Sequence, residues 1–436
     1  MNTTLSAFLL LAVPGLPLLL AYPALHSRLP WPCHIALLPA LVLLTVPTVA
    51  PIDLPWLLFG TGLGIDGVSR LLLGMSVVLW AVAAPLLRAP AGDAADNFPM
   101  IFCLLAVAGN LGAIVATDLV GFFAFSALMG YSFYGLLVVG GDGATRRAGR
   151  VYLAVMILAD LALFEALLIA AATSGDLGFA AVRHVIGQSG ASGLYLSMVL
   201  VGFAARAGVW PLHFWLPPAF AAARPAVALL LGGVPVAIGM LGMVRWLPLG
   251  DITFHGLGLT IQGMGAAAVL YAILAGLIRA QLKLLPAYAA IIATGLFTTT
   301  LGAGLADPAA WARYENLTHF FYISLVFGLA VLVAAVGWLE TRRHYPALPA
   351  RQKGDGSPWF ARWAGAVLHC CGQKGLDTLQ RLRASWLVRA GLLGQVHTWQ
   401  RALDRSERAL QRWILAITLF LLLVIVVAFV GASSWN

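Results

Sequence analysis

Residues 202–238 read GFAARAGVWPLHFWLPPAFAAARPAVALLLGGVPVAI, an apolar stretch that contains two arginines and five prolines. Arg206 lies inside an apolar run, and Pro211, Pro217 and Pro218 break the helix that the run begins. An arginine at membrane depth is costly where it faces lipid, so we expect Arg206 to face the protein interior or a water-filled cavity. Broken backbone is tolerated in a bilayer only in the same two places. The stretch therefore predicts either part of an ion path or a structural arginine that reaches the membrane interface.

The composition of the whole chain is that of a polytopic membrane protein. Hydrophobic residues make up 61% of the sequence and charged residues 10%, and the mean hydropathy is +0.92. These values lie outside the range of soluble globular proteins. We therefore expect an all-α membrane protein with about twelve transmembrane helices, some of them broken, and one amphipathic helix at the interface.

Hydropathy places the predicted spans along the chain. They lie near residues 5–25, 32–50, 67–87, 98–116, 118–139, 151–172, 190–209, 225–247, 261–280, 282–305, 316–339 and 414–432. The first run has no basic leader and no small-residue cleavage site, so it is expected to remain as a span. Residues 51–66, rich in Pro, Gly and Asp, predict an extended or hairpin crossing at the surface.

Basic residues orient the predicted spans. They cluster after the fifth span (Arg146, Arg147 and Arg150), around the turn after the ninth (Arg279 and Lys283), and in the segment after the eleventh. These three loops lie on one side of the membrane if every span crosses it. By the positive-inside rule that side is cytoplasmic, so we expect both termini on the periplasmic side of a bacterial inner membrane.

Residues 340–413 form the one long segment predicted not to span. They hold half of the chain's 26 Lys and Arg residues, interleaved with Trp and Leu at helical spacing. This pattern predicts a cytoplasmic amphipathic helix that binds anionic lipid or a neighbouring subunit. The interleaved tryptophans and the flanking spans argue against nucleic acid as a partner. We therefore divide the chain into N-terminal transmembrane helices (1–97), a core (98–339), this basic segment, and a C-terminal anchor (414–436).

Few ionisable residues fall within or beside the predicted spans, and these are the candidates for function. The candidates are Asp160, Glu165, Arg206, His213, Lys283, Glu315 and His319. Asp160 and Glu165 are five apart, so they lie about 140° apart around a helix, and one of them is expected to pair with Arg206. Each candidate is also compatible with a hydrogen-bonded packing role. A row of such groups on separate spans is nevertheless typical of a proton path.

Three motifs in order carry a family resemblance. The first is Arg206, Gly208, Pro211, Leu212, His213, Trp215, Leu216 and Pro217; the second is Leu282, Lys283, Ala287 and Tyr288; the third is Thr318, His319, Phe320 and Phe321. On these motifs residues 53–330 resemble the antiporter-like membrane subunits of complex I, Mrp cation/proton antiporters, membrane-bound hydrogenases and a bicarbonate-uptake complex. The resemblance implies proton conduction through two related five-helix halves, driven by other membrane and peripheral subunits of a hetero-oligomeric complex.

The chain also departs from the family pattern. The family's glutamate on the fifth span falls at Ala127, and two of its lysines fall at Ala237 and Ile323. The lysine of the first motif is Arg206, whose side chain stays protonated at any accessible pH. Two functions therefore remain open: a divergent proton-conducting subunit, in which Asp160 is the partner of Arg206, and a non-conducting scaffold. The sequence holds no nucleotide, flavin, haem, quinone, iron–sulfur or metal motif, so we expect no cofactor and no redox chemistry in this chain itself.

The topology predicts how single cysteines will react. Because residues 340–413 are expected on the cytoplasmic side, Cys introduced at Lys353 or Arg381 should be protected from a membrane-impermeant thiol reagent added outside intact cells. The same positions should be labelled after the membrane is permeabilised. Labelling from outside before permeabilisation would contradict the orientation.

Overall fold

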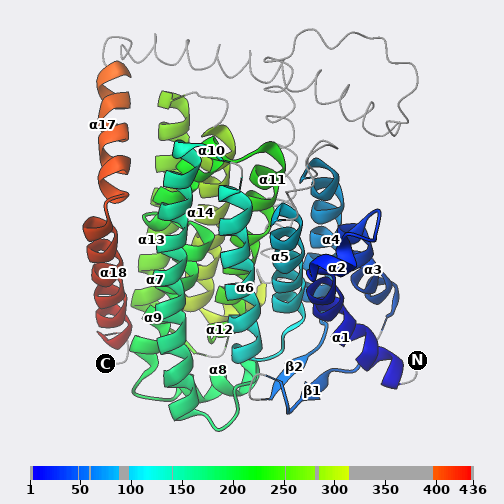
Figure 1. Cartoon of the computed structure of the whole chain (residues 1–436). Coiled ribbons are helices and arrows are strands. Elements are labelled where there is room, and N and C mark those ends of the chain that lie inside the picture. Colours follow the sequence, from blue (N-terminus) through cyan, green and yellow to red (C-terminus); the bar gives the residue numbers. More distant parts are fainter. Residues whose placement is uncertain are drawn as a thin grey trace, which may run out of the picture.

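The structure is a computed structural model that describes residues 3–47, 49–57, 60–87, 98–139, 141–250, 252–279, 284–313 and 396–433. Over these residues the chain forms a bundle of helices that run side by side, with one small hairpin of strands at one end (Figure 1). The predicted all-α membrane class is confirmed. Eight helical segments are long and apolar enough to cross a membrane, when residues 192–222 and 226–246 are each counted as one broken helix. Three shorter apolar helices accompany them within the described ranges.

The elements follow one another in this order. They are α1 (Thr3–Leu20), α2 (Pro23–His26), α3 (Pro32–Thr45), β1 (Ile52–Leu54), β2 (Thr61–Leu63), α4 (Gly67–Leu87), α5 (Phe98–Val115), α6 (Leu119–Val138), α7 (Gly143–Thr173), α8 (Phe179–Gly187), α9 (Ser192–Ala207), the 3₁₀ helix η1 (Leu212–Trp215), α10 (Leu216–Ala222), α11 (Pro225–Gly233), α12 (Pro235–Trp246), α13 (His255–Arg279), α14 (Leu285–Ala306), α17 (Val396–Leu410) and α18 (Trp413–Ser433).

Most of the predicted spans have a helical counterpart. The predicted span at 316–339 lies outside the described residues, so the count of twelve is not confirmed. One boundary differs clearly: α7 has 31 residues and begins at Gly143, eight residues before the predicted start. The carboxylate of Asp142 accepts a hydrogen bond from the backbone N–H of Thr145 and caps the helix there. The arginines that we assigned to a loop therefore lie on the first turns of α7.

A second difference is a break in the predicted span at 225–247. The structure divides it into α11 and α12 at Val234, whose backbone angles are φ −112° and ψ −67°. Pro235 follows and lacks the N–H that would continue the helix. Two broken helices, α9–η1–α10 and α11–α12, are thus present in the described bundle, and both are largely buried.

The two ends of the chain lie at the same end of the bundle, and α17 lies at the other (Figure 1). The C-terminal helix α18 packs against α9 and α13. The first turns of α7 share a hollow with Gln411 at the end of α17. This arrangement agrees with the predicted grouping of the basic loops on one side, while the compartment that each side faces stays a prediction.

The hairpin expected at 51–66 is confirmed. β1 and β2 are antiparallel, with Asp53 opposite Gly62. The carboxylate of Asp118 accepts hydrogen bonds from the backbone N–H of Gly62 and of Gly121, at 2.8 Å each. One side chain therefore caps α6 and holds the hairpin against it.

Helices α13 and α14 make the most extensive contact between any two described elements. Their backbones meet at glycines. A Cβ added to Gly265 would lie 2.5 Å from the backbone nitrogen of Thr299, and one added to Gly258 or Gly302 would also meet backbone of the facing helix. Only residues without a side chain allow this approach.

This contact predicts the effect of one substitution. Gly265→Leu should separate α13 from α14 and lower the free energy of unfolding by about 1–3 kcal/mol, or abolish folding, because backbone cannot move aside as a side chain can. Gly263→Leu is the matched control, since an added Cβ there meets nothing within 4 Å. The measurement is the unfolding midpoint and the yield of monodisperse protein in detergent. Equal effects at both positions would show that the close contact is not formed.

Candidate functional site

The centre of the candidate site is the point where α9 ends. Arg206 is in the last turn of α9 and its side chain is fully buried. Gly208 then takes a left-handed conformation, with φ +67°, and ends the helix. The indole N–H of Trp215 donates to the carbonyl of Ala205 at 2.9 Å, so η1 folds back against the end of α9. The break expected from the prolines is therefore present, beside a buried arginine.

Arg206 pairs with Asp160, as we predicted. Its Nη2 donates to the Oδ1 of Asp160 on α7, and both side chains are buried. Gly202 permits the close approach of the two helices, because a Cβ there would lie 3.1 Å from the carbonyl oxygen of Ala159. Each charge compensates the other in a medium that cannot solvate either, so the pair is a condition for burying the arginine at all.

The pair does not use all of the arginine's donors. The Nε and Nη1 atoms of Arg206 are buried without a hydrogen-bond partner in the described part of the chain. Tyr131 and Tyr152 lie within electrostatic range of both Arg206 and Asp160. Buried donors usually have a partner, and ordered water commonly supplies it. The site therefore has the chemistry to hold water molecules beside a fixed charge pair.

His213 lies in η1 and is only 1% exposed. Neither of its ring nitrogens has a hydrogen-bond partner in the part of the chain that the structure describes. Its ring meets that of Tyr271 on α13 edge to face, with centroids 4.9 Å apart. His213 is thus a buried imidazole with two unused nitrogen atoms, and a relay through it would need a water molecule or another polar group at each of them.

Tyr271 connects His213 to a second charged cluster that the sequence reasoning missed. Its hydroxyl donates to the Oε1 of Glu407 on α17 at 2.9 Å. The Oε2 of Glu407 accepts from Arg279 at 2.9 Å, and the hydroxyl of Tyr288 lies 3.4 Å from Oε1. Glu407 is only 4% exposed. A carboxylate from the C-terminal segment is therefore buried against α13 and α14.

Asp404 gives this second cluster a further acid. One guanidinium nitrogen of Arg279 contacts Asp404 and the other contacts Glu407, both at 2.9 Å. The side chain of Asp404 is 53% exposed, whereas that of Glu407 is 6% exposed. Arg279 thus keeps one acidic partner even when Glu407 is neutral.

The remaining predicted site residues are not brought to either cluster. Glu165 lies on the outer face of α7, exposed beside Leu161, Phe164 and Leu168. Lys283, Glu315 and His319 lie outside the described residues, as does Ile323. The positions where the family has a glutamate and a lysine are Ala127 on α6 and Ala237 on α12, and neither residue has an ionisable side chain.

A cavity lies beside the helix break, but it is small and apolar. Its volume is ≈ 50 Å³, and side chains such as Leu200, Val209, Met243 and Leu301 line it. Sites for small-molecule ligands usually exceed about 300 Å³, and an apolar cavity of this kind stays dry. Among the described residues no group of three His, Cys, Asp or Glu side chains is arranged to hold a metal.

The ion pair predicts a coupled mutational effect. Arg206→Met and Asp160→Asn should each lower the free energy of unfolding by about 3–5 kcal/mol, because each leaves one buried charge without its partner. The double variant should lose less than the sum of the two, since it leaves no uncompensated charge. Unfolding midpoints of the purified protein measure the effect, with Glu165→Gln as a control on the same helix. Strictly additive losses would show that the two side chains do not interact.

Known proteins are similar to this chain over its central region. Residues 116–342, more than half of the 436, match the family described as NADH:quinone oxidoreductase/Mrp antiporter, TM. Hydrogenase-4 component B of Escherichia coli (strain K12) is 24% identical over 332 residues, which cover 72% of this chain and 46% of that protein. A probable K(+)/H(+) antiporter subunit of Rhizobium meliloti (strain 1021) is 29% identical over 285 residues, which cover 63% of this chain and 52% of that protein.

A solved structure shares the fold. A chain of the membrane-bound sulfane sulfur reductase, an archaeal respiratory membrane complex, superposes with a TM-score of 0.62 at 23% identity, over 77% of this chain and 56% of that one. This chain spans about half the length of the two curated relatives named above. The match to the family covers the broken helix α9–η1–α10, the pair of Arg206 and Asp160, and His213. The chain belongs to the NADH:quinone oxidoreductase/Mrp antiporter transmembrane family.

Proposed function

We propose that this chain is the proton-conducting, antiporter-like subunit of a hetero-oligomeric complex in a bacterial inner membrane. The observation that carries the proposal is the buried group of His213, Tyr271 and Glu407 beside a broken helix, in which the Tyr271 ring packs against His213 and its hydroxyl donates to Glu407. A membrane protein has little reason to bury a carboxylate and an unpaired imidazole together unless they serve transport or a partner. The names of the related hydrogenase component and antiporter subunit support the same class.

In this proposal the two charge clusters have different roles. Arg206 is a fixed positive charge and cannot relay a proton, because a guanidinium does not release its proton at accessible pH. Asp160 takes the place of the acid that is missing at Ala127 and compensates that charge. Water molecules held by the free donors of Arg206 would connect the pair to the rest of the path.

Glu407 and His213 are the described side chains that we assign to the relay. Protonating Glu407 weakens its contact with Arg279, but Asp404 remains beside the same guanidinium and keeps it paired. This second partner lowers the cost of neutralising Glu407, which a working relay group must allow. Lys283, Glu315 and His319 are proposed as further members of the relay, and residues 98–339 as the conducting core.

A non-conducting scaffold is the second candidate, and the same cluster provides a reason for it. Glu407 and Asp404 attach α17 to α13 through Arg279, so this contact also serves to dock α17 on the core. The alanines at 127 and 237 remove groups that conduction would use. A scaffold would need the attachment of α17 and not the titration of Glu407.

Either role requires neighbouring subunits, and α7 carries a suitable face. Leu161 is 58% exposed and Phe164 44%, and the exposed carboxylate of Glu165 lies between them and Leu168. In the described chain Glu165 has no ion pair or hydrogen bond. A carboxylate among exposed apolar side chains within a span is costly against lipid. We assign this face to a partner helix that brings a cation or a hydrogen-bond donor.

The experiment that tests conduction measures proton uptake by proteoliposomes that hold the purified complex. Glu407→Gln preserves the shape of the side chain but removes its proton exchange, and Lys283→Met/His319→Phe does the same for the other relay members. If the chain conducts, each variant should assemble and lose a factor on the order of 10² to 10⁴ in uptake, with smaller losses where water bypasses the group.

Asp404→Asn is the matched control for Glu407→Gln. Asp404 lies on the same helix as Glu407 and contacts the same arginine, but its side chain is exposed. Under conduction Asp404→Asn should lose clearly less uptake than Glu407→Gln, because it removes only the second partner of Arg279 and keeps the exchangeable proton of Glu407. Normal uptake by an intact complex in both Glu407→Gln and the Lys283→Met/His319→Phe variant would exclude the relay and favour the scaffold.

A further inference from the structure

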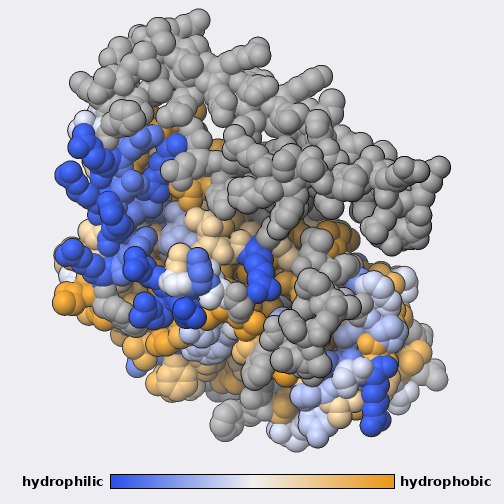
Figure 2. All heavy atoms as spheres, turned by 45° about the horizontal axis from the view of Figure 1, so that its top comes forward, coloured by the Kyte–Doolittle hydropathy of each residue, from blue (hydrophilic) through white to orange (hydrophobic). Residues whose placement is uncertain are grey.

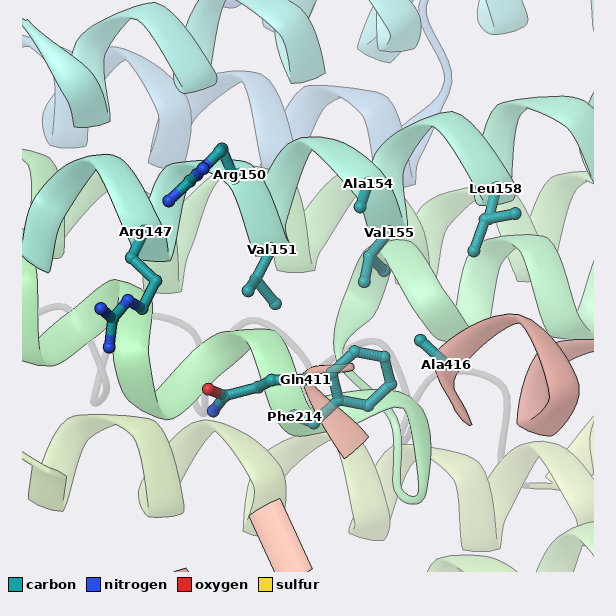
Figure 3. Close-up of a pocket in the computed structure, with 9 residues that line it drawn as sticks. All are labelled: Arg147, Arg150, Val151, Ala154, Val155, Leu158, Phe214, Gln411 and Ala416. Carbon is teal, nitrogen blue, oxygen red and sulfur yellow. The ribbon is translucent and has the colours of Figure 1, made fainter. Parts of the chain in front are cut away.

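A groove runs between α7 and the junction of α17 and α18. Its volume is about 200 Å³, and Figure 3 shows the residues that line it. Its lining residues are Arg147, Arg150, Val151, Ala154, Val155, Leu158, Phe214, Gln411 and Ala416. The two arginines lie at one end, and Leu158 and Ala416 lie at the other (Figure 3). The groove is therefore basic at one end and apolar along the rest of its length.

A second hollow extends the groove past Arg147. Its volume is about 270 Å³, and it reaches Pro218, Ala221 and Ala222 of α10. The two hollows share Arg147, Val151 and Gln411, so they meet beside that arginine. No acidic residue is among the described residues that line either of them. The arrangement provides one basic position between two largely apolar troughs.

The two arginines are available to a ligand. Arg147 and Arg150 are exposed and three residues apart, so they lie on neighbouring positions of the same helix. In the part of the chain that the structure describes, neither makes an ion pair or a hydrogen bond. Hydrophilic side chains gather at this end of the bundle, next to apolar ones (Figure 2). The groove thus begins where the membrane interface is expected and runs into the apolar zone.

We propose that this groove binds one anionic phospholipid, with its phosphate on Arg147 and Arg150 and an acyl chain along Val151, Ala154 and Leu158. Guanidinium groups bind phosphate oxygens with two parallel hydrogen bonds, and the amide of Gln411 is a further donor at the same end. The apolar trough has the surface that an acyl chain covers and that a free phosphate ion does not.

The positive charge of Arg147 and Arg150 determines which lipid headgroup the groove prefers. Two arginines in a groove whose described lining holds no acid carry more positive charge than one phosphate neutralises, so a headgroup with a cationic choline is disfavoured. The cytoplasmic leaflet is the side rich in anionic lipid, and our orientation of the chain places this end there. Next to the groove, Ile414 of α18 is 79% exposed, as expected of a helix that faces lipid. The site lies outside the Arg206 and Glu407 clusters and does not depend on proton conduction.

The test uses the full chain purified in detergent, with phosphatidylglycerol, phosphatidylcholine and inorganic phosphate as probes. Lipid retention by native mass spectrometry and the unfolding midpoint are the two readouts. Wild type should retain phosphatidylglycerol and unfold at a higher temperature in its presence, whereas phosphatidylcholine and phosphate should have little effect. Arg147→Gln and Arg150→Gln should each weaken retention about tenfold, and Arg146→Gln should not, because Arg146 does not line the groove.

Ala154→Trp tests the apolar part of the site with both arginines intact. It should fill the trough and reduce retention of phosphatidylglycerol, while Ile157→Trp, at an exposed position outside the groove, should leave retention unchanged. Four results would overturn the proposal: equal retention of the two lipids, an effect of phosphate alone that equals that of the lipid, full retention by the Arg147→Gln/Arg150→Gln variant, or full retention by Ala154→Trp. The arginine variants change exposed side chains, so they provide the test even where Ala154→Trp does not fold.

Discussion

The pairing of Arg206 with Asp160 is the interaction on which the arrangement of the central helices depends. A buried guanidinium has no solvent to stabilise it, so α7 must present its carboxylate at one height and on one face. That requirement fixes α7 against α9, and Gly202 allows the separation to be small enough. The break that follows at Gly208 then positions η1, and with it His213, toward α13. Charge compensation and helix termination act together within a few residues.

Much of the fold could be predicted from the sequence, for simple physical reasons. Hydropathy located most of the spans that the structure describes, because a bilayer requires long apolar helices. Pro211 marked the break because proline cannot continue a helix. The partner of Arg206 was predictable because an acid on a neighbouring span was available at Asp160. The start of α7 was misplaced because Arg146, Arg147 and Arg150 were assigned to a loop, although a helix can extend beyond the apolar zone when its end is capped, here by Asp142. Pro235 also indicated the second break, but a prediction of spans from hydropathy alone does not take prolines into account.

Glu407 could not be found in the same way. It lies in a segment in which arginines outnumber the acids, so the net charge gives no sign of a buried carboxylate. Whether Glu407 is buried depends on where α17 packs against the bundle, and the periodicity of the sequence does not specify that. A signal existed in the spacing of Asp404 and Glu407, which are three apart and so share a helix face. Arg279 at the end of a span offered the complementary charge. The contact joins residues 128 apart in the chain, and only the folded arrangement of α13, α14 and α17 brings them together.

The glycine contacts between α13 and α14 have a mechanical consequence. Two helices whose backbones touch at several levels cannot rotate or slide separately, because the nearest atoms belong to the main chain. They are therefore expected to move as one body, about 37 Å long for the 25 residues of α13. Arg279 and Tyr288, which hold Glu407, are attached near one end of that helix pair, while Phe254 and Leu305 are joined by a backbone hydrogen bond near the other. Any displacement of α17 that moved this end of the helix pair would therefore also move the far end, where Phe254 and Leu305 meet.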